Sequence, residues 1–271
     1  MISFLFWNLN KKPLENSIAR LSFKYDVDVL MFAEFSIEPS HLLICLNSNN
    51  KYHYFYSPTI GCEKIHIFTR FKIDFIQPIY ESERLTIRHL TLPGLLDIIL
   101  AINHFPSKLY WEPASQSLEC VALADTIKYV ENQVGHSRTV LVGDLNMNPF
   151  EDGVVGASGL HAVMSRTIAK KGSRIVQSKQ YPFFYNPMWN FFGDATPGPP
   201  GTYYYDRSEH KVYFWNIFDQ VLIRPELIDF FDNDEMKIIE SDGEISFVTH
   251  HGFPDVNNIS DHLPIFFKLN L

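Results

Sequence analysis

The segment Thr139-Val140-Leu141-Val142-Gly143-Asp144-Leu145-Asn146 joins a short apolar run to an acid and an amide. Continuous apolar runs of this length, followed by a glycine, are typical of strands that are buried on both faces. Asp144 and Asn146 are two residues apart, so in an extended chain their side chains point to the same side. The segment therefore predicts a buried strand, Thr139–Gly143, that places two polar side chains together at its carboxyl end.

The same arrangement, a polar side chain beside an apolar run, recurs along the whole chain. It occurs at Trp7-Asn8-Leu9-Asn10, Ala33-Glu34, Asn103-His104-Phe105, Phe218-Asp219-Gln220 and Ser260-Asp261-His262. Buried or half-buried strands are predicted next to these motifs and between them, at Ile2–Trp7, Val27–Ala33, Ile65–Arg70, Arg84–Leu92, Leu96–Asn103, Phe218–Ile223 and Leu263–Leu269. We therefore expect several strand ends to contribute to one polar site.

Helical patterns alternate with these strands. Pro13 can open a helix, and the residues that follow it on one face are Leu14, Ile18, Leu21 and Tyr25. A second helix is predicted from Pro113 to Gln133, with Leu118 and Tyr129 in its amphipathic pattern. The stretch from about 150 to 215 is rich in Gly, Pro and aromatic residues, and we expect long loops there with one short helix near Gly156–Lys170. No linker divides the chain, so we expect a single domain over residues 1–271.

The composition limits the classes of function. A net charge of -8 argues against a protein that binds nucleic acid through a generally positive surface. It does not exclude an enzyme in which a bound cation supplies the positive charge. The three cysteines have no CxxC spacing and predict free thiols in a reducing compartment. No apolar run reaches the ~20 residues of a membrane span, so we expect a cytoplasmic protein with no membrane contact.

The residue types at the strand ends suit the hydrolysis of a phosphodiester. In that reaction the negative charge on the phosphoryl oxygens must be neutralised, and a water must be oriented and deprotonated. The leaving oxygen must also be stabilised. Glu34 is an oxygen ligand of the kind that Mg²⁺ prefers. Asp144 could take a proton from water while Asn146 donates to a phosphate oxygen. Asp219 could fix the tautomer of His262 and raise its pKa.

The combination of these motifs, in this order from Asn8 to His262, resembles the endonuclease/exonuclease/phosphatase superfamily, which includes deoxyribonuclease I and the apurinic endonucleases. The resemblance implies an α/β (α+β) fold, a four-layer sandwich of two packed, mainly antiparallel or mixed β-sheets with helices on the outside. It also implies Mg²⁺ or Mn²⁺ as the cofactor.

The resemblance assigns a role to each motif. Asn8 and Asn10 would lie at the metal and phosphate site, Glu34 would be the main metal ligand, and Asp261 would lie near the metal. The catalytic group would consist of His104 beside the leaving group, Asp144 as the base that orients water, Asn146 as a phosphate donor, and the pair of Asp219 and His262. Some family members have an acidic ligand at the position of Asn10, so a second metal position is in doubt.

Weaker matches add four residues. Glu63 precedes Arg70 by seven residues, as does a supporting Glu that braces the first His in deoxyribonuclease I-like members. Arg84, Lys108 and Trp111 lie where substrate contacts are expected. For Glu63 and Arg84 an exposed surface charge is the alternative. The aromatic residues between Tyr181 and Trp215 could stack on unpaired bases or cap the sheets.

The function that we predict is a Mg²⁺-dependent phosphodiesterase, most simply a nuclease acting on DNA or RNA. Nucleic acid would then be the partner, and nothing in the sequence implies an obligate protein partner. One alternative is a phosphatase or phosphodiesterase acting on inositol phosphates or lipid headgroups. A second is an inactive binding module on the same fold, which predicts gaps in the site. Asn10 is the only debatable position.

Overall fold

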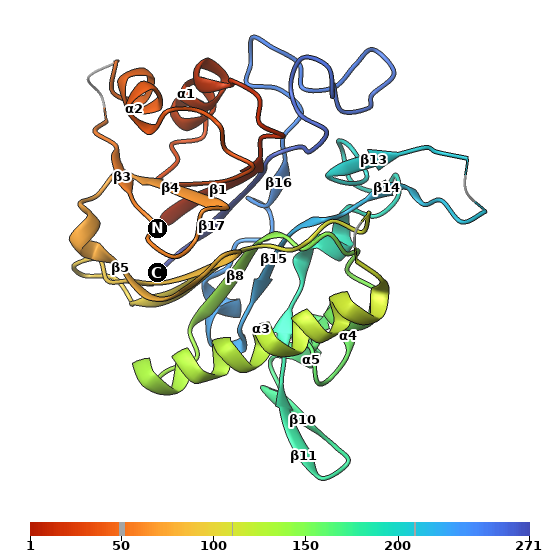
Figure 1. Cartoon of the computed structure of the whole chain (residues 1–271). Helices are drawn as coiled ribbons and strands as arrows, with labels where there is room; N and C mark the ends of the chain where they lie inside the picture. Colours follow the sequence, from red (N-terminus) through yellow and green to blue (C-terminus); the bar gives the residue numbers. More distant parts are fainter. Residues whose placement is uncertain (49–51, 110, 209) are drawn as a thin grey trace.

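The computed structural model describes residues 1–48, 52–109, 111–208 and 210–271 (Figure 1). Within these residues two large β-sheets pack face to face over a shared apolar core, and helices lie on their outer faces. This is the expected α/β sandwich with mixed sheets, so the prediction of the fold class is confirmed. None of the helices in these residues is both long and apolar enough to cross a membrane.

The first sheet has the strand order β16-β17-β1-β2-β4-β3 among the described residues. Its parallel pair, β1 and β2, lies at the centre, and the other strands pair antiparallel. The strands are β1 (Ile2–Asn8), β2 (Val29–Ala33), β3 (Phe55–Ser57), β4 (Ile65–Thr69), β16 (Lys237–Ile238) and β17 (Ile265–Leu269).

The second sheet has the order β5-β6-β7-β8-β15-β12-β9 in the same residues. Here β7 and β8 are parallel, and β8 and β15 are antiparallel. The strands are β5 (Ile76–Ser82), β6 (Leu85–Leu90), β7 (Ile98–His104), β8 (Thr139–Asp144), β9 (Ala162–Val163), β12 (Phe184–Tyr185) and β15 (Asp219–Ile223).

The alternation of side chains in the second sheet divides the core in two. Leu100 and Ile102 of β7 face the first sheet, whereas Ile99 and Ala101 face α3 (Pro113–Val134). Because both faces are covered, the strand is apolar throughout. The first sheet is covered by α1 (Glu15–Lys24) and α2 (Pro39–Asn47), which Figure 1 shows side by side.

Helix α3 extends over the predicted residues, but its buried stripe differs from the expected one. Leu118 and Tyr129 are exposed, whereas the buried side chains include Cys120, Leu123, Ile127 and Val130. A helix of this length has several apolar rows. Packing against β6, β7 and β8 decides which of these rows is buried. The sequence of the helix alone does not contain this information.

The expectation of loops with one helix near Gly156–Lys170 was wrong in detail. Residues 150 to 170 contain two single turns, α4 (Asp152–Val155) and α5 (Arg166–Ala169), separated by β9. The remainder includes the hairpins β10 (Ser173–Val176) with β11 (Lys179–Pro182) and β13 (Tyr203–Tyr205) with β14 (Phe214–Asn216). Short 3-10 helices are η1 (Ile73–Phe75), η2 (Pro187–Phe191) and η3 (Pro225–Phe230). Strands of two to four residues carry too little periodicity for a sequence pattern.

Strand register brings the motif residues together at one edge. His104 is the Cα partner of Asp144 across β7 and β8, and Asp144 is the partner of Asp219 across β8 and β15. In the other sheet, Asn8 ends β1 opposite Ala33, which precedes Glu34. The carboxyl ends of β1, β2, β7 and β8 therefore lie at the same edge of the sandwich.

Gly143 makes this convergence possible, since an ideal Cβ at this position would lie 1.8 Å from the carbonyl oxygen of Asn103. Gly143→Ala is therefore expected to lower the free energy of unfolding by ~3 kcal/mol or more through overpacking. Gly135→Ala is the control, because Gly135 has a φ of 88° but open space around it, and it should cost about 1 kcal/mol of left-handed strain. Urea titrations measure both, and equal losses would contradict the close packing of β7 on β8.

Candidate active site

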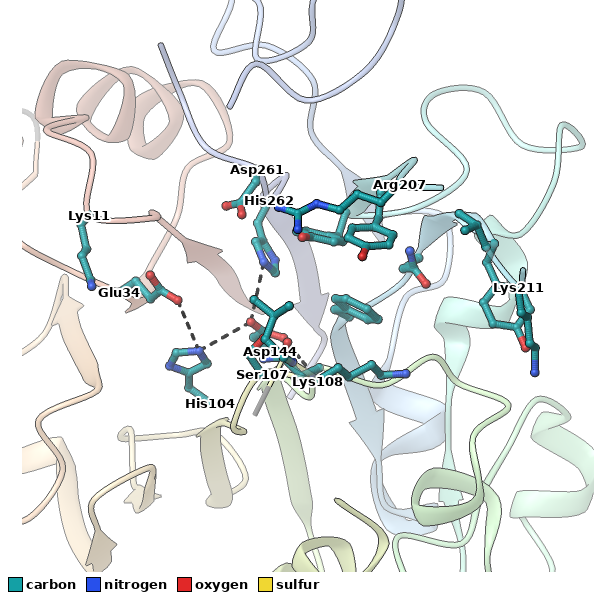
Figure 2. A pocket seen from close by; sticks show the side chains of 18 residues that line it. Lys11, Glu34, His104, Ser107, Lys108, Asp144, Arg207, Lys211, Asp261 and His262 are labelled. Atoms are coloured by element: carbon teal, nitrogen blue, oxygen red, sulfur yellow. Dashed lines mark hydrogen bonds and ion pairs between the residues drawn. The ribbon is translucent and has the colours of Figure 1, made fainter. Parts of the chain in front are cut away.

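A cavity of 640 Å³ opens at the edge where the two sheets meet (Figure 2). The predicted site residues that line it are Glu34, His104, Lys108, Asp144, Asn146, Asp261 and His262. Asn8 and Asp219 lie behind this surface, hydrogen-bonded to Asp144 and His262 respectively. Segments that are far apart in the sequence thus form one group of carboxylates, amides and imidazoles.

Asp144 is the central carboxylate. Its Oδ2 accepts a hydrogen bond from Asn8 Nδ2 at 3.0 Å, and its Oδ1 accepts one from the backbone N–H of Asn146 at 2.8 Å. The side chain is 1% exposed, and Oδ2 lies 3.7 Å from His104 Nε2 and 3.8 Å from His262 Nε2. The carboxylate is therefore fixed from both sheets and still faces the cavity between two imidazoles.

His262 and Asp219 form a buried pair. His262 Nδ1 donates to Asp219 Oδ2 at 2.8 Å, which leaves Nε2 directed toward Asp144. Burial opposes a charge on the imidazole, but the carboxylates of Asp219, Asp144 and Asp261 outweigh it and raise the pKa of His262. Burial is also the main cause that raises the pKa of Asp219. His262 is therefore an imidazolium donor at neutral pH.

The backbone around His262 is tied to β1. Trp7 Nε1 donates to the carbonyl of His262 at 2.9 Å, and Ser260 Oγ donates to the carbonyl of Asn8 at 2.8 Å. Ser260 Oγ also accepts the backbone N–H of His262 at 3.1 Å. These bonds explain the serine in the Ser260-Asp261-His262 motif. Ser260 links the segment that carries His262 to the end of β1.

His104 differs from His262 in its protonation. Burial lowers the pKa of His104, against the attraction of Asp144 and Glu34, and the positive charges of His262 and Arg84 lower it further. Its Nδ1 is buried and has no hydrogen-bond partner among the described residues. The site therefore contains one neutral and one charged imidazole, on either side of Asp144.

Glu34 is the carboxylate best suited to hold a cation. It follows β2 with a φ of 46°, which turns its side chain into the cavity. One carboxylate oxygen lies 3.8 Å from His104 Nε2, and the side chain is 33% exposed. No hydrogen bond to this carboxylate is found in the described residues. Its open carboxylate is the type of oxygen ligand that a hard divalent cation prefers, but Glu34 belongs to neither of the groups of described residues whose ligand atoms lie close enough together to share an ion.

Two groups of acids and histidines have metal-ligand spacing in the described residues. One contains Asp144, Asp219 and His262. The other, His89, Asp97 and His136, lies at the far end of β6 and β7. There His136 Nδ1 accepts the backbone N–H of Arg138, so Nε2 carries the proton that it donates to Asp97. That nitrogen has no lone pair for a metal, and the group is a hydrogen-bonded cluster.

The structure does not bring every predicted residue into the cavity. Glu63 is exposed in a turn and does not line the cavity, and Glu81 rather than Glu63 binds the neighbouring backbone at Ile60 and Gly61. Trp111 and Asn10 do not line the cavity, although Asn10 N–H donates to Asn8 Oδ1. Arg84 does not line the cavity either. Its backbone carbonyl accepts a hydrogen bond from the backbone N–H of His104.

Sequence reasoning missed one wall of the cavity. This wall is formed by the hairpin of β13 and β14 and its connecting loop. Its tyrosines, Tyr203, Tyr205 and Tyr213, belong to the segment from Tyr181 to Trp215 for which base stacking was one expectation, whereas the basic residues Arg207 and Lys211 were missed. Lys11 and Ser107 were also missed. The signal for the wall was an alternating aromatic pattern with basic residues in an acidic chain. For Lys11 the signal was its place directly after the first motif.

Comparison with known proteins agrees with this geometry. The chain belongs to the endonuclease/exonuclease/phosphatase family, whose model matches residues 5–262, and the resemblance of the motifs is thereby confirmed. No curated protein matches the chain. Among solved structures, the endonuclease domain of TRAS1, a telomere-specific non-LTR retrotransposon, is similar over 100% of this chain and 99% of its own, with a TM-score of 0.55 and 17% identity.

Two further structures share the fold. An AP endonuclease from Archaeoglobus fulgidus is similar over 100% of both chains, with a TM-score of 0.57 and 16% identity. TDP2 of D. rerio, in a complex with single-strand DNA product, is similar over 100% of this chain and 99% of its own, with a TM-score of 0.56 and 16% identity. At these identities the likeness establishes the fold alone.

The pair of His262 and Asp219 predicts a specific pH dependence. Because the pKa of His262 is raised in the folded state, the folded protein holds a proton that the unfolded chain releases above about pH 6.5. The unfolding free energy should therefore fall as the pH rises from there toward the folded pKa. Asp219→Asn should lower the pKa of His262 and flatten this slope. NMR titration of the imidazole in EDTA measures the pKa, and an unchanged value in Asp219→Asn would contradict the assignment.

Proposed function

We propose that this member of the endonuclease/exonuclease/phosphatase family hydrolyses phosphodiester bonds in nucleic acid with the help of Mg²⁺ or Mn²⁺. The observation that carries the proposal is the position of Asp144, a fixed carboxylate between a neutral and a charged imidazole, beside the open carboxylate of Glu34. The free state of all three cysteines supports a reducing compartment such as the cytoplasm.

Asp144 would act as the base. A water in the cavity gives its proton to the Asp144 carboxylate as its oxygen forms a bond to phosphorus. The bond from phosphorus to the leaving oxygen breaks, and that oxygen keeps the electron pair and takes up a proton from solvent water. Asn8 and the backbone N–H of Asn146 hold the carboxylate in the orientation that aims the water. The second amide proton of Asn146 is available to a phosphate oxygen, since the first is donated to the carbonyl of Phe105.

The two histidines would have different tasks. His262, held as an imidazolium by Asp219, donates Nε2–H to a non-bridging oxygen whose charge grows in the transition state. His104, as a neutral imidazole, donates a hydrogen bond to the leaving oxygen without adding a second cation. Removing one such donor typically costs ~10²–10³ in turnover.

Glu34 would be the main ligand of the divalent cation, with Asp261 at its side and Asn8 behind. When bound, the cation offsets the charge of the phosphoryl oxygens as a Lewis acid. The backbone N–H of Asn10 donates to Asn8 Oδ1, and Asn10 does not line the cavity. Because Asn10 stands at the position of a possible second metal ligand, this favours one cation over two.

Nucleic acid is the substrate that we favour. The cavity walls combine cations with tyrosine rings, which suits phosphates joined to bases. The structural relatives include an AP endonuclease and a protein in a complex with single-strand DNA product. A lipid-headgroup enzyme would need an apolar or basic surface for the bilayer, and an inactive binding module would show gaps at the site. The carboxylates and histidines of the site are all present.

Substitution of the central residues tests the chemistry. Asp144→Asn and His262→Gln should each reduce turnover by about 10³-fold with the fold intact, and Glu34→Gln should also raise the Mg²⁺ concentration needed for half-maximal rate. Glu63→Gln is the control, because Glu63 is exposed outside the cavity. The assay compares single-stranded DNA, RNA and inositol phosphates in Mg²⁺ and in EDTA. Near-wild-type turnover by pure Asp144→Asn protein would exclude Asp144 as the base.

Removal of the metal is a separate test. EDTA should abolish hydrolysis, and added Mg²⁺ or Mn²⁺ should restore it. Isothermal titration with Mn²⁺ should show at least tenfold weaker binding in Glu34→Gln than in the wild-type protein, because the ligand loses its charge. Equal Mn²⁺ affinity of the two proteins would move the metal site away from Glu34.

A further inference from the structure

We propose that Lys11 and Arg207 form two phosphate subsites on opposite sides of the reaction centre, so that the enzyme cuts a nucleotide chain internally rather than at its end. This proposal rests on the proposed function and deepens it. Figure 2 shows Lys11 beside Glu34 on one side of the cavity, and Arg207 and Lys211 on the other. Both subsites belong to the same cavity lining as the catalytic groups.

The local charge of the cavity runs against that of the whole chain. The protein has 23 Lys and Arg residues against 31 Asp and Glu residues, yet the cavity is lined by Lys11, Lys108, Arg207 and Lys211. Its three carboxylates already have tasks, as ligands of the cation or as the base. The cations are therefore not required to balance these acids, and their concentration at one place favours a substrate with several negative charges.

Among the described residues, Lys108 is the only one of these four cations that forms an ion pair. Lys108 forms an ion pair with Glu151, and the ammonium of Lys211 lies 5.1 Å from the centre of the Tyr213 ring. Lys11 and Arg207 form no ion pair with any carboxylate in the part of the chain that the structure describes. The guanidinium of Arg207 has a contact with the Tyr205 ring, 5.9 Å from its centre. A guanidinium free at a cavity wall matches the oxygens of a phosphate.

The backbone position of Lys11 is held by hydrogen bonds. Lys11 has a φ of 57°, its N–H donates to the carbonyl of Glu34 at 2.9 Å, and its carbonyl accepts Ser36 Oγ at 2.7 Å. This segment connects the end of β1 to the residue after β2. Lys11 is therefore held next to the carboxylate that would bind the cation.

The hairpin that carries Arg207 is anchored on its other face. Tyr203 and Tyr205 line the cavity, whereas Tyr204 between them stacks on Phe253 with ring centres 4.0 Å apart. Trp215 is the cross-strand partner of Tyr204, and the centres of their two rings lie 5.4 Å apart. The hairpin is thus held by the contact of Tyr204 with Phe253, and Arg207 lies two residues after the end of β13.

Subsites on both sides imply that the scissile phosphate has a phosphate neighbour in each direction. A terminal nucleotide has such a neighbour in one direction alone, and a small phosphoester has none. A phosphodiester inside a nucleotide chain has a phosphate neighbour for each of the two subsites. It therefore gains binding energy that a terminal nucleotide and a small phosphoester lack. Internal cleavage is the consequence.

The tetranucleotide d(TpTpTpT), with its central linkage as the scissile bond, tests the proposal. Its outer linkages are replaced, one at a time, by neutral methylphosphonates, and the two dinucleotide products of central cleavage are measured by chromatography in Mg²⁺. We expect each replacement to lower kcat/KM by about tenfold in the wild-type protein. Arg207→Gln should remove the effect of one replacement, and Lys11→Gln should remove the effect of the other.

Lys12→Gln is the matched control, because Lys12 is adjacent in sequence but binds the carbonyl of Asn257 and does not line the cavity. It should keep both effects. If both replacements keep their full effect in Arg207→Gln and Lys11→Gln, or if one outer phosphate alone matters in the wild-type protein, the proposal is overturned. If the wild-type protein hydrolyses neither the tetranucleotide nor bis-p-nitrophenyl phosphate, the proposed function itself fails.

A binding measurement gives a second readout that does not depend on turnover. In an Asp144→Asn background, the dissociation constant for the tetranucleotide is measured against salt concentration. Each lost phosphate contact should reduce the slope of log Kd against log salt by about 0.7. An unchanged slope in Arg207→Gln and Lys11→Gln would contradict the assignment of these residues to phosphates.

Discussion

The hydrogen bond from Asn8 to Asp144 is the interaction on which the site depends. It joins the end of β1 in one sheet to the end of β8 in the other, and both side chains are buried. A buried carboxylate is costly unless donors surround it, and here an amide, a backbone N–H and two imidazoles lie around it. Because the two sheets provide these groups separately, the carboxylate is correctly placed only when the whole sandwich is packed.

The same packing gives the two histidines of the site different protonation states. His104 and His262 both approach Asp144, but Nδ1 of His262 is hydrogen-bonded to the carboxylate of Asp219, whereas Nδ1 of His104 is buried and has no partner among the described residues. One imidazole is therefore charged and the other neutral, although both are buried. The difference comes from strand register, since β15 places Asp219 opposite Asp144 and β7 places His104 on the other side.

Most of the central fold could be predicted from the sequence, because β1, β2, β7 and β8 are apolar runs that end at motif residues, and β15 is an apolar run that begins at one. The ends of these strands also identified Glu34, His104, Asp144 and His262 as neighbours. Strands such as β9 and β12 could not be predicted, because two residues of pairing depend on a neighbour that is distant in sequence. The wall with Arg207 was missed for the same reason: its place beside His262 follows from the anchoring of Tyr204 on Phe253, a contact that no local pattern encodes.

The central claim is that these converging groups hold a divalent cation beside a phosphate. Anomalous scattering from crystals soaked in Mn²⁺ tests it most directly. We expect a peak in the cavity, about 2.2 Å from a carboxylate oxygen of Glu34, a distance typical of a hard cation and its oxygen ligand. A peak at His89, Asp97 and His136 with none at Glu34 would contradict it.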